Sequence, residues 1–291
     1  MSRFRFIAAE KASHAVAGLC RVLGVSTSGF YAWTQRPSSA RARADGALTA
    51  RIRAVHQASR GTYGAPRVCA ELRAQGTPVA RKRVARLMRI DGLTGCRPRR
   101  FVRTTIADPA ATAPDLVQRR FTASAPDQVW LTDITYVPTD EGWLYLAAIL
   151  DGYSRRVVGW SLTDHLRTDL VLAALTMAVQ ARRPGPGLIH HSDRGCQYTA
   201  VAYTTTLETY GIRQSLGQPG TCWDNAVAES FFATLKTELV HRQRWATRQQ
   251  AKIAIFEYLE IFYNRQRRHS TLRYLSPADF EATRPQEVHA A

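Results

Sequence analysis

The chain has 291 residues, a hydrophobic content of 45% and a formal net charge of +17. This length is typical of about two domains, and this hydrophobic content is enough to build a core, which excludes a wholly disordered chain. No apolar run reaches the roughly 18 residues that a membrane-spanning helix requires, and the N-terminus lacks the long apolar core of a signal peptide. We therefore expect a cytoplasmic location and no membrane partner.

The charge is distributed unevenly along the chain. Residues 1–120 contain 23 Lys and Arg against 6 Asp and Glu, whereas residues 121–291 contain 17 of each kind. An arginine-rich genome would raise the basic content, but it would not leave the second part neutral. A basic module beside a neutral one indicates an arm that binds a polyanion such as nucleic acid, joined to a catalytic body.

The cysteines show no paired spacing. Their number is odd and no C-x-x-C motif occurs among Cys20, Cys69, Cys96, Cys196 and Cys222. This pattern argues against a disulfide framework and against a zinc site, and it is consistent with a reducing cytoplasm.

The first segment has the pattern of a helix-turn-helix. A first predicted helix carries apolar residues at helical spacing, namely Val16, Leu19, Cys20 and Leu23. Gly24 can end that helix, and Ser26 can cap a second one that carries aromatic residues. An ordinary helical hairpin fits the same pattern equally well, so the residues alone leave both interpretations open.

A second helical unit is predicted from about Leu48 to Leu93. Pro66 is placed to open one helix and Gly76 to end it. The next helix, Ala80–Ile90, turns Val84, Leu87 and Met88 inward and leaves a basic row outside. A basic row is usually a solvated face, but on a module of this charge we interpret it as a phosphate-contacting helix. Its DNA-binding candidates are Arg81, Lys82, Arg83 and Arg86.

Residues 96–125 are predicted to form a basic linker rich in proline and alanine, because little in them could pack. After Pro126 the pattern changes. Strands are predicted at 128–137, 143–150, 157–162, 188–192 and 212–215, and helices at 168–181, 199–210 and 248–263. The expected organisation is a helical DNA-binding region at 1–95, the linker, and a catalytic core at 126–286 that ends in a helix and a basic tail. The core is predicted to be α/β, a mixed sheet flanked by helices.

Three acidic residues carry the chemistry of this core. Asp133 lies within a predicted strand, Asp193 follows the end of another, and Glu229 lies on a later predicted helix. A carboxylate inside a strand is costly, so its plain alternative is a side chain satisfied by the backbone or by an arginine. Three carboxylates at one point would repel one another unless divalent cations neutralised them, and such a site suits two-metal phosphoryl transfer.

Two further residues share the glutamate helix. Lys236 lies two turns beyond Glu229, and its side chain projects in nearly the same direction. Asn225 lies one turn before Glu229. A carboxylate, an amide and an ammonium along one helix suit the path of a DNA strand, so Asn225 and Lys236 are DNA-binding candidates. Without the two aspartates, a surface arrangement would be the default interpretation.

At these residues the sequence resembles the DDE transposase and retroviral integrase superfamily, and most of all the OrfB-type transposases of bacterial insertion sequences. The resemblance is carried by the runs at 130–136, 191–198 and 224–236, with 61–67 upstream and 262–270 and 275–277 near the C-terminus. It implies a ribonuclease H-like core, two Mg²⁺ or Mn²⁺ ions held by Asp133, Asp193 and Glu229, and Lys236 near the DNA end. The zinc-binding module of retroviral integrases is not visible, so no zinc is expected.

The implied function is metal-dependent cleavage and strand transfer at insertion-sequence ends. The implied partners are double-stranded DNA, further copies of the chain in the DNA complex, and the product of an upstream reading frame. The implied location is the bacterial cytoplasm, in association with the nucleoid. Two alternatives remain: a stand-alone ribonuclease H-like DNA nuclease, and a non-catalytic helix-turn-helix DNA-binding regulator. The complete acid triad argues against the regulator.

Overall fold

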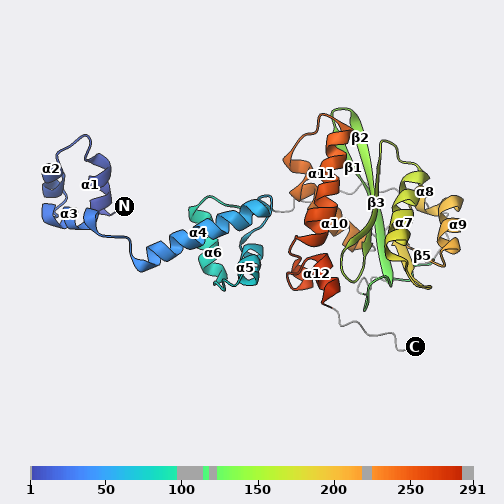
Figure 1. The fold of residues 1–291 in the computed structure, drawn as a ribbon. Helices are drawn as coiled ribbons and strands as arrows, with labels where there is room; N and C mark the ends of the chain where they lie inside the picture. The colour runs from blue at the N-terminus through green and yellow to red at the C-terminus, as the bar shows by residue number, and fades with distance from the viewer. Residues whose placement is uncertain (1, 97–113, 118–122, 218–224, 284–291) are drawn as a thin grey trace. The chain divides into compact units, whose positions relative to one another are not determined.

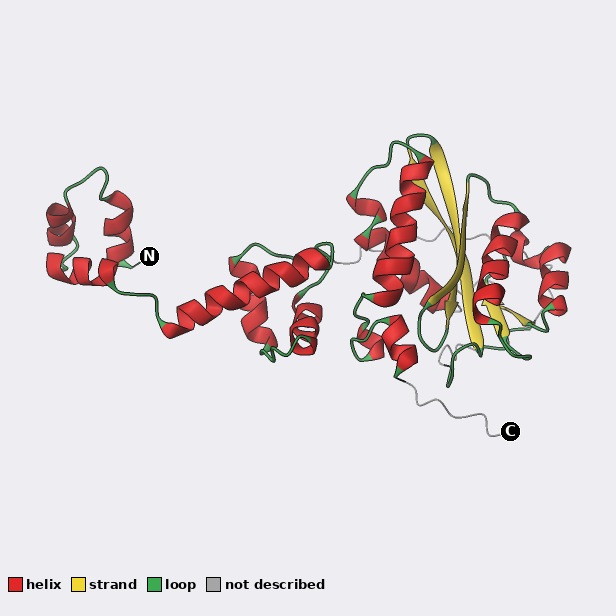
Figure 2. Ribbon diagram, viewed as in Figure 1, coloured by secondary structure: helices red, strands yellow, loops and turns green. Residues whose placement is uncertain are grey.

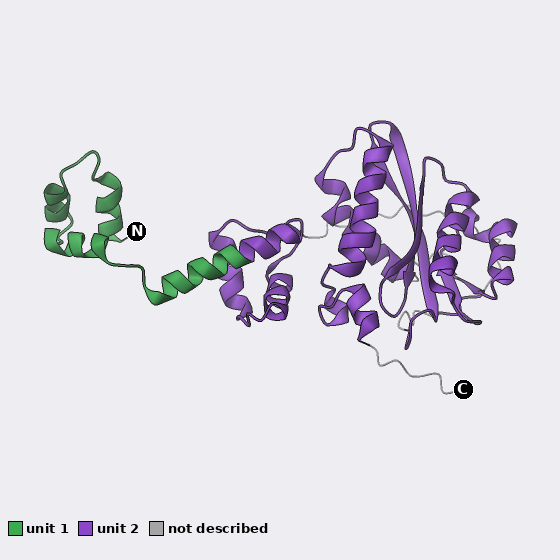
Figure 3. Cartoon of the chain, in the orientation of Figure 1, with its two compact units in different colours: residues 1–51 green, residues 52–291 purple. Residues whose placement is uncertain are grey.

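The computed structural model describes residues 2–96, 114–117, 123–217 and 225–283 (Figure 1). The chain divides into two compact units, Met1–Arg51 and Ile52–Ala291 (Figure 3). This division falls inside a long helix, α4 (Ala40–Ala58), which the sequence predicted only from Leu48. Most of the predicted linker lies outside the described residues.

The first unit begins with three short helices, α1 (Arg3–Glu10), α2 (Val16–Val22) and α3 (Thr27–Gln35). Each contributes one residue to a small buried core made of Ile7, Cys20 and Phe30. The sequence did not predict α1.

The predicted pair of helices in this unit is confirmed, together with its turn. Gly24 follows α2 with a φ of +61°, a left-handed conformation that glycine adopts without steric cost. The Ser26 hydroxyl accepts a hydrogen bond from the Gly29 N–H (3.0 Å) and caps α3.

The second unit continues with α5 (Ala65–Ala74) and α6 (Arg81–Ile90). Pro66 lies in the first turn of α5, and Gly76 follows its end with a φ of +74°, as predicted. The inward residues of α6 are buried as predicted, namely Val84, Leu87 and Met88. Its basic residues differ in exposure: Arg81, Lys82 and Arg89 are exposed, whereas Arg83 and Arg86 are partly buried.

The remainder is a mixed five-stranded sheet with the order β3-β2-β1-β4-β5 (Figure 2), which confirms the predicted α/β class. The strands are β1 (Val129–Thr139), β2 (Gly142–Asp151), β3 (Val157–Thr163), β4 (Ile189–Ser192) and β5 (Arg213–Leu216). The first three strands are antiparallel neighbours, whereas β4 runs parallel to β1 and β5 parallel to β4.

Helices cover both faces of the sheet (Figures 1 and 2). On one face, α7 (Thr168–Arg182) packs Leu170, Ala174 and Leu175 against a core that includes Trp130 and Ile149. On the same side, the predicted helix 199–210 is divided at Ala200 into α8 (Cys196–Thr199) and α9 (Val201–Thr209).

The other face is covered by α10 (Ala226–Glu238) and α11 (Arg248–Phe256). The sequence predicted one regular helix at 248–263, but α11 passes into a π-helical segment, Glu257–Tyr263. This segment buries Tyr258, Leu259, Phe262 and Tyr263. The buried residues form two adjacent pairs, Tyr258–Leu259 and Phe262–Tyr263, which lie four residues apart. This spacing fits both an α-helix and a π-helix, so the hydrophobic pattern could not distinguish the two.

The C-terminal end of α10 is anchored by a buried ion pair. Glu238 is 6% exposed and Arg267 is 2% exposed. Two hydrogen bonds of 2.8 Å join their carboxylate and guanidinium groups, and the Tyr258 hydroxyl donates a third to Glu238 (2.8 Å). Arg267 belongs to the predicted basic tail, so this part of the tail is an internal support of the core.

The upstream motif 61–67 contacts the same region within the second unit. The Arg67 guanidinium lies 3.6 Å from the Glu238 carboxylate and donates to the Arg268 carbonyl (3.0 Å). Arg268 in turn donates to Glu71 of α5 (2.7 Å), and its N–H donates to the Tyr63 hydroxyl (2.6 Å). The upstream motif 61–67 and the C-terminal motif 262–270 therefore contribute to one contact.

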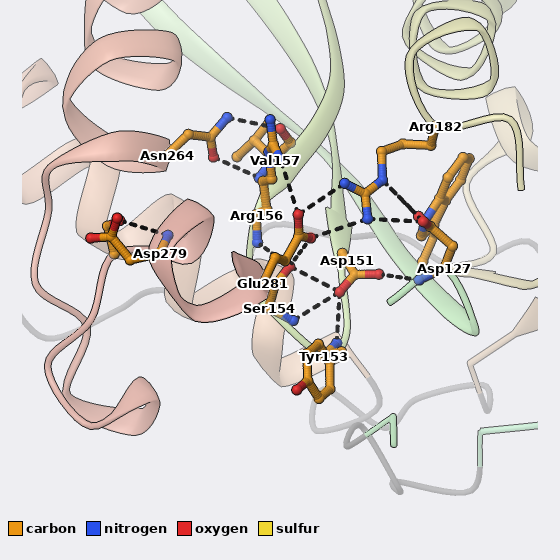
Figure 4. Close-up of polar contacts among 12 residues, drawn as sticks. Asp127, Asp151, Tyr153, Ser154, Arg156, Val157, Arg182, Asn264, Asp279 and Glu281 are labelled. Atoms are coloured by element: carbon orange, nitrogen blue, oxygen red, sulfur yellow. Dashed lines mark hydrogen bonds and ion pairs between the residues drawn. The ribbon is translucent and has the colours of Figure 1, made fainter. Parts of the chain in front are cut away.

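A second polar network joins the start of β1 to the end of the core (Figure 4). Arg182 at the end of α7 pairs with Asp127 (2.8 Å) and with Glu281 (2.9 Å) of α12 (Pro277–Ala282). Asp151 accepts hydrogen bonds from the Tyr153 and Ser154 N–H groups and so stabilises the turn after β2.

Within the described ranges, no helix is long and apolar enough to cross a membrane. The described cysteines Cys20, Cys69, Cys96 and Cys196 are free thiols, and Cys222 lies outside the described residues.

The buried ion pair generates a stability prediction. Glu238→Ala leaves the Arg267 cation buried without its carboxylate partner, so we expect the free energy of unfolding to fall by about 3 kcal/mol or more. The measurement is chemical denaturation of both proteins. The control is Arg244→Ala, which removes an ion pair to Asp140 whose arginine side chain is 86% exposed, and should cost about 1 kcal/mol or less. Equal small effects of both substitutions would contradict the anchoring role.

Candidate active site

The register of two parallel strands brings two of the predicted acids together. Leu131 of β1 pairs with His191 of β4 in the last pair of this parallel ladder, and Asp133 and Asp193 each follow two residues later in the chain. Neighbouring strands lie about 4.8 Å apart, so the two carboxylates leave adjacent backbones. Asp133 is inside β1, the central strand of the sheet, and Asp193 is the first residue after β4.

The third acid comes from α10, which packs on β1. Asn225 immediately precedes this helix, is 8% exposed, and donates from Nδ2 to the Thr132 carbonyl (2.8 Å). This bond holds the first turn of α10, which contains Glu229, beside the residue that precedes Asp133. The sequence placed Asn225 on a DNA path, but its burial and its bond to β1 give it a positioning role. No partner for its Oδ1 is found among the described residues.

The electrostatics of Asp133 reflect this convergence. Burial first, and then the charges of Asp193 and Glu229, raise the pKa of Asp133 to about 8, against the Ile134 N–H and the Lys236 ammonium. Burial likewise raises the pKa of Asp193, which the Gly195 N–H opposes by donating to its carboxylate (3.0 Å). Asp193 and Glu229 therefore disfavour the ionised form of Asp133, which is the condition that a bound cation would relieve.

The carboxylates do not form a ready-made metal cluster. In the part of the chain that the structure describes, no three histidine, cysteine or acidic side chains stand close enough to hold one metal ion together. Asp133 turns one carboxylate oxygen to the Ile134 N–H (2.7 Å).

Lys236 occupies the space between the acids and the tip of the first hairpin. It is partly buried, and its Nζ lies 4.9 Å from the centre of the Tyr136 ring. Burial lowers the pKa of Lys236, and the charge of Asp133 opposes that shift. The sequence predicted that the side chain of Lys236 projects in nearly the same direction as that of Glu229. The charge interaction between Lys236 and Asp133 agrees with this direction. Its aromatic partner Tyr136 was missed, although it lies only three residues from Asp133.

The two adjacent histidines before Asp193 are structural. The His190 Nε2 lies 3.1 Å from the Tyr203 hydroxyl, and the His191 Nδ1 lies 2.8 Å from the Ser215 hydroxyl. Burial lowers the pKa of His190 to about 3, so its ring is neutral. Tyr198 adds support from α8 by placing its hydroxyl 3.2 Å from Thr132. The basic residues of α6 lie on a separate helix and are not part of this site.

Models of known families match most of the chain. An HTH-like domain matches residues 43–101, and two integrase core domain models match residues 123–222 and 210–277. The chain is 44% identical to an insertion element IS600 uncharacterized 31 kDa protein of Shigella sonnei, over 90% of this chain and 97% of that protein. It is 40% identical to transposase InsF for insertion sequence IS3A of Escherichia coli K12, over 96% and 98% of the two chains.

Solved structures with a similar fold include a simian T-cell lymphotropic virus intasome in complex with a PP2A regulatory subunit, with a TM-score of 0.48 and 13% identity over 81% of this chain and 76% of that chain. The Mos1 transposase catalytic domain with raltegravir and Mn has a TM-score of 0.40 and 18% identity over 46% and 71%. The mixed sheet, the two integrase core matches and the 40% identity to InsF over nearly its whole length agree on one origin. This chain belongs to the insertion-sequence transposases of the integrase superfamily, whose ribonuclease H-like core serves transposition and DNA integration.

Proposed function

We propose that this transposase cleaves DNA at the ends of its insertion sequence and joins the freed 3′ ends to target DNA, with Asp133, Asp193 and Glu229 as its catalytic acids. The observation that carries the proposal is that three acids from separate elements interact: the charges of Asp193, which follows β4, and of Glu229 on α10 both act on Asp133 of β1. Holding Asp193 and Glu229 close to the partly buried Asp133 costs the fold stability, and the cost is understandable if the acids serve a cation.

The donor set fits a hard divalent cation. Carboxylate oxygens are the ligands that Mg²⁺ and Mn²⁺ prefer, and no thiolate or free imidazole competes at this site in the described residues. We assign two ions to the three acids. When bound, such ions supply activation of the attacking water or 3′-hydroxyl and neutralise the charge that develops on the phosphate. The protein's own part is to hold the acids on β1, β4 and α10.

We propose that the DNA contacts basic side chains of the protein. Lys236 lies beside Asp133, where its ammonium meets a phosphate near the scissile bond. Arg81, Lys82, Arg83 and Arg86 on α6 contact phosphates further away, and the proposed division of labour is DNA binding by 1–95 and catalysis by 126–286. Two DNA ends require at least two protomers, so we propose a homo-oligomer on DNA. Nothing in the names of the relatives points to a separate upstream product, and that partner stays a prediction.

The relatives do not favour either alternative, a stand-alone nuclease or a non-catalytic regulator. A strand-transfer assay with a pre-cut DNA end distinguishes the proposed enzyme from a nuclease, because only the transposase joins the 3′ end to a second duplex.

The first prediction from this proposed function concerns the three acids. Asp133→Asn, Asp193→Asn and Glu229→Gln should each reduce strand cleavage about 10³-fold or more, and the double mutants should be little worse, because the residues act as a unit. DNA affinity should remain. The measurement is gel-based cleavage of labelled element ends in Mg²⁺. Near-normal cleavage by Glu229→Gln would exclude it from the site.

The second prediction concerns pH and metal. The ordinary aspartate pKa is about 4, and that of Asp133 is about 8. Between these values the folded metal-free protein binds more protons than the unfolded chain, so Asp133 makes the free energy of unfolding fall as pH rises. Asp133→Asn should flatten this fall.

Mg²⁺ should therefore raise the melting temperature more at about pH 9 than at about pH 6, because the cation takes the ionised carboxylate. The same titration of Asp133→Asn is the control and should show little stabilisation at either pH. A metal effect that is independent of pH and of Asp133 would contradict this site.

The third prediction concerns the basic helix. Replacing the exposed Arg81 and Lys82 by Gln should lower the slope of log affinity against log salt by about 0.9 for each phosphate that the variant no longer binds. Arg213→Gln on β5, which is also exposed, is the matched control and should leave the slope unchanged. Salt titrations of duplex DNA binding by the full chain measure this. An equal change in both variants would indicate a general charge effect and no assigned phosphate contact.

A further inference from the structure

Two large aromatic side chains stand exposed at the tip of the β1–β2 hairpin. Tyr136 is 40% exposed and Trp143 is 50% exposed. In the antiparallel register Tyr136 pairs with Tyr145 and Pro138 with Trp143, so the two rings are diagonal neighbours on one face of the sheet. Their centroids lie 4.9 Å apart at 79°, an edge-to-face pair.

The hydrophobic core does not use this pair. Further along the same face, Ile134 and Ala147 belong to the core under α7, whereas Tyr136 and Trp143 lie outside that core. A strand position that faces water is ordinarily polar, because exposed apolar area adds nothing to stability. The contact between the two rings stabilises the hairpin, but it leaves a large aromatic area exposed to a ligand.

The pair adjoins the catalytic acids and is accompanied by cations. Lys236, whose charge acts on Asp133, places its Nζ 4.9 Å from the Tyr136 ring centre. Arg248 donates from Nε to the Trp143 carbonyl (3.1 Å). The pairing of β4 with β1 ends at Leu131, so in the described residues no strand pairs with β1 on that edge beyond Leu131. Lys236 therefore links this end of the hairpin to the acids, because it contacts the Tyr136 ring and its charge acts on Asp133.

We propose that Tyr136 and Trp143 form a stacking surface for an unpaired nucleobase of the DNA end. Every base presents a flat π face, which stacks on exposed aromatic rings, while neighbouring cations bind the phosphates on either side. A base within a duplex has both faces covered by its neighbours, so this surface selects a base released from the stack. The proposal rests on the proposed function, because it requires the DNA end to lie at Asp133.

The cations favour this occupant over a second copy of the chain. Lysine is depleted at protein–protein interfaces, whereas the sugar-phosphate backbone on both sides of a stacked base is anionic along its whole length and attracts both Lys236 and Arg248. A second copy on this face is one outcome that the test identifies.

The experiment measures binding without divalent metal, so that it does not depend on cleavage. Two probes are compared by fluorescence anisotropy with the full chain: a blunt duplex, and the same duplex with mismatched terminal base pairs. We expect the wild type to prefer the mismatched end by about tenfold, within the range that one stacked base supplies. Trp143→Ala and Tyr136→Leu should lose this preference and keep their affinity for the blunt duplex.

The controls separate stacking from general effects. Trp143→Phe keeps a ring and should retain most of the preference. Tyr210→Ala removes a tyrosine of matching exposure (41%) at the end of α9 and should leave the preference intact. Circular dichroism verifies folding, and if Trp143→Ala does not fold, Tyr136→Leu decides the result.

An equal affinity of the wild type for both probes, or an unchanged preference in both ring-deleting variants, overturns the proposal. So does a Trp143→Ala variant that changes only the oligomeric state, because the surface would then be a protein interface. The proposed catalytic function is distinguishable from this: its failure is a wild type that does not cleave in Mg²⁺, whatever its preference for the mismatched end.

Discussion

The central constraint in this molecule is the presence of a carboxylate in the middle of its central strand. Asp133 lies within β1, where its neighbours on both sides are Thr132 and Ile134 and where burial alone disfavours its charge. Asp193 and Glu229 increase that penalty, and only Lys236 and one backbone N–H reduce it. A fold selected for stability alone would replace this aspartate by valine or isoleucine. The transposase instead keeps this aspartate, although the charges of Asp193 and Glu229 disfavour its ionised form.

The rest of the core is organised to hold those acids. The parallel pairing of β1 with β4 brings the two aspartates to neighbouring strands, and it requires a crossover connection, which α7 provides. The helix α10 is held at both ends, by Asn225 bound to the Thr132 carbonyl at its start and by Glu238 paired with Arg267 at its end. Between these anchors Phe231, Phe232 and Leu235 are buried. A helix fixed in this way cannot slide or rotate without breaking a buried polar bond.

The polar network around Glu238 joins two motifs that lie far apart in the sequence. Arg67 and Glu71 come from the helical segment before the core, and Arg267 and Arg268 from its C-terminal part. Their charges neutralise one another in a partly buried contact, so each side needs the other. The large positive charge of residues 1–120 is thus divided between residues such as Arg67, which serve the fold, and exposed residues such as Arg81 and Lys82.

The sequence by itself determined the class of the fold, most of its elements and the family. Alternating apolar runs, the glycine and proline positions and the capping serine Ser26 are local signals, and the elements they predicted appear within a few residues of their expected bounds. The motifs around Asp133, Asp193 and Glu229 identified the family because it is characterised by residue types in a given order, which the sequence contains directly. The local signals did not predict α1, placed the start of α4 too late and gave a regular helix where the structure has a π-helical segment. These features depend on packing more than on residue pattern.

Only the tertiary structure decided how these residues work on one another. Asn225 and Lys236 share a helix in the sequence, yet one is buried against β1 and the other reaches Tyr136. Arg267 reads as part of a basic tail, yet it is 2% exposed and paired with Glu238. The reason is physical: burial, hydrogen bonding and pKa depend on the three-dimensional distances to groups far along the chain, and a residue's own sequence neighbourhood does not contain those distances.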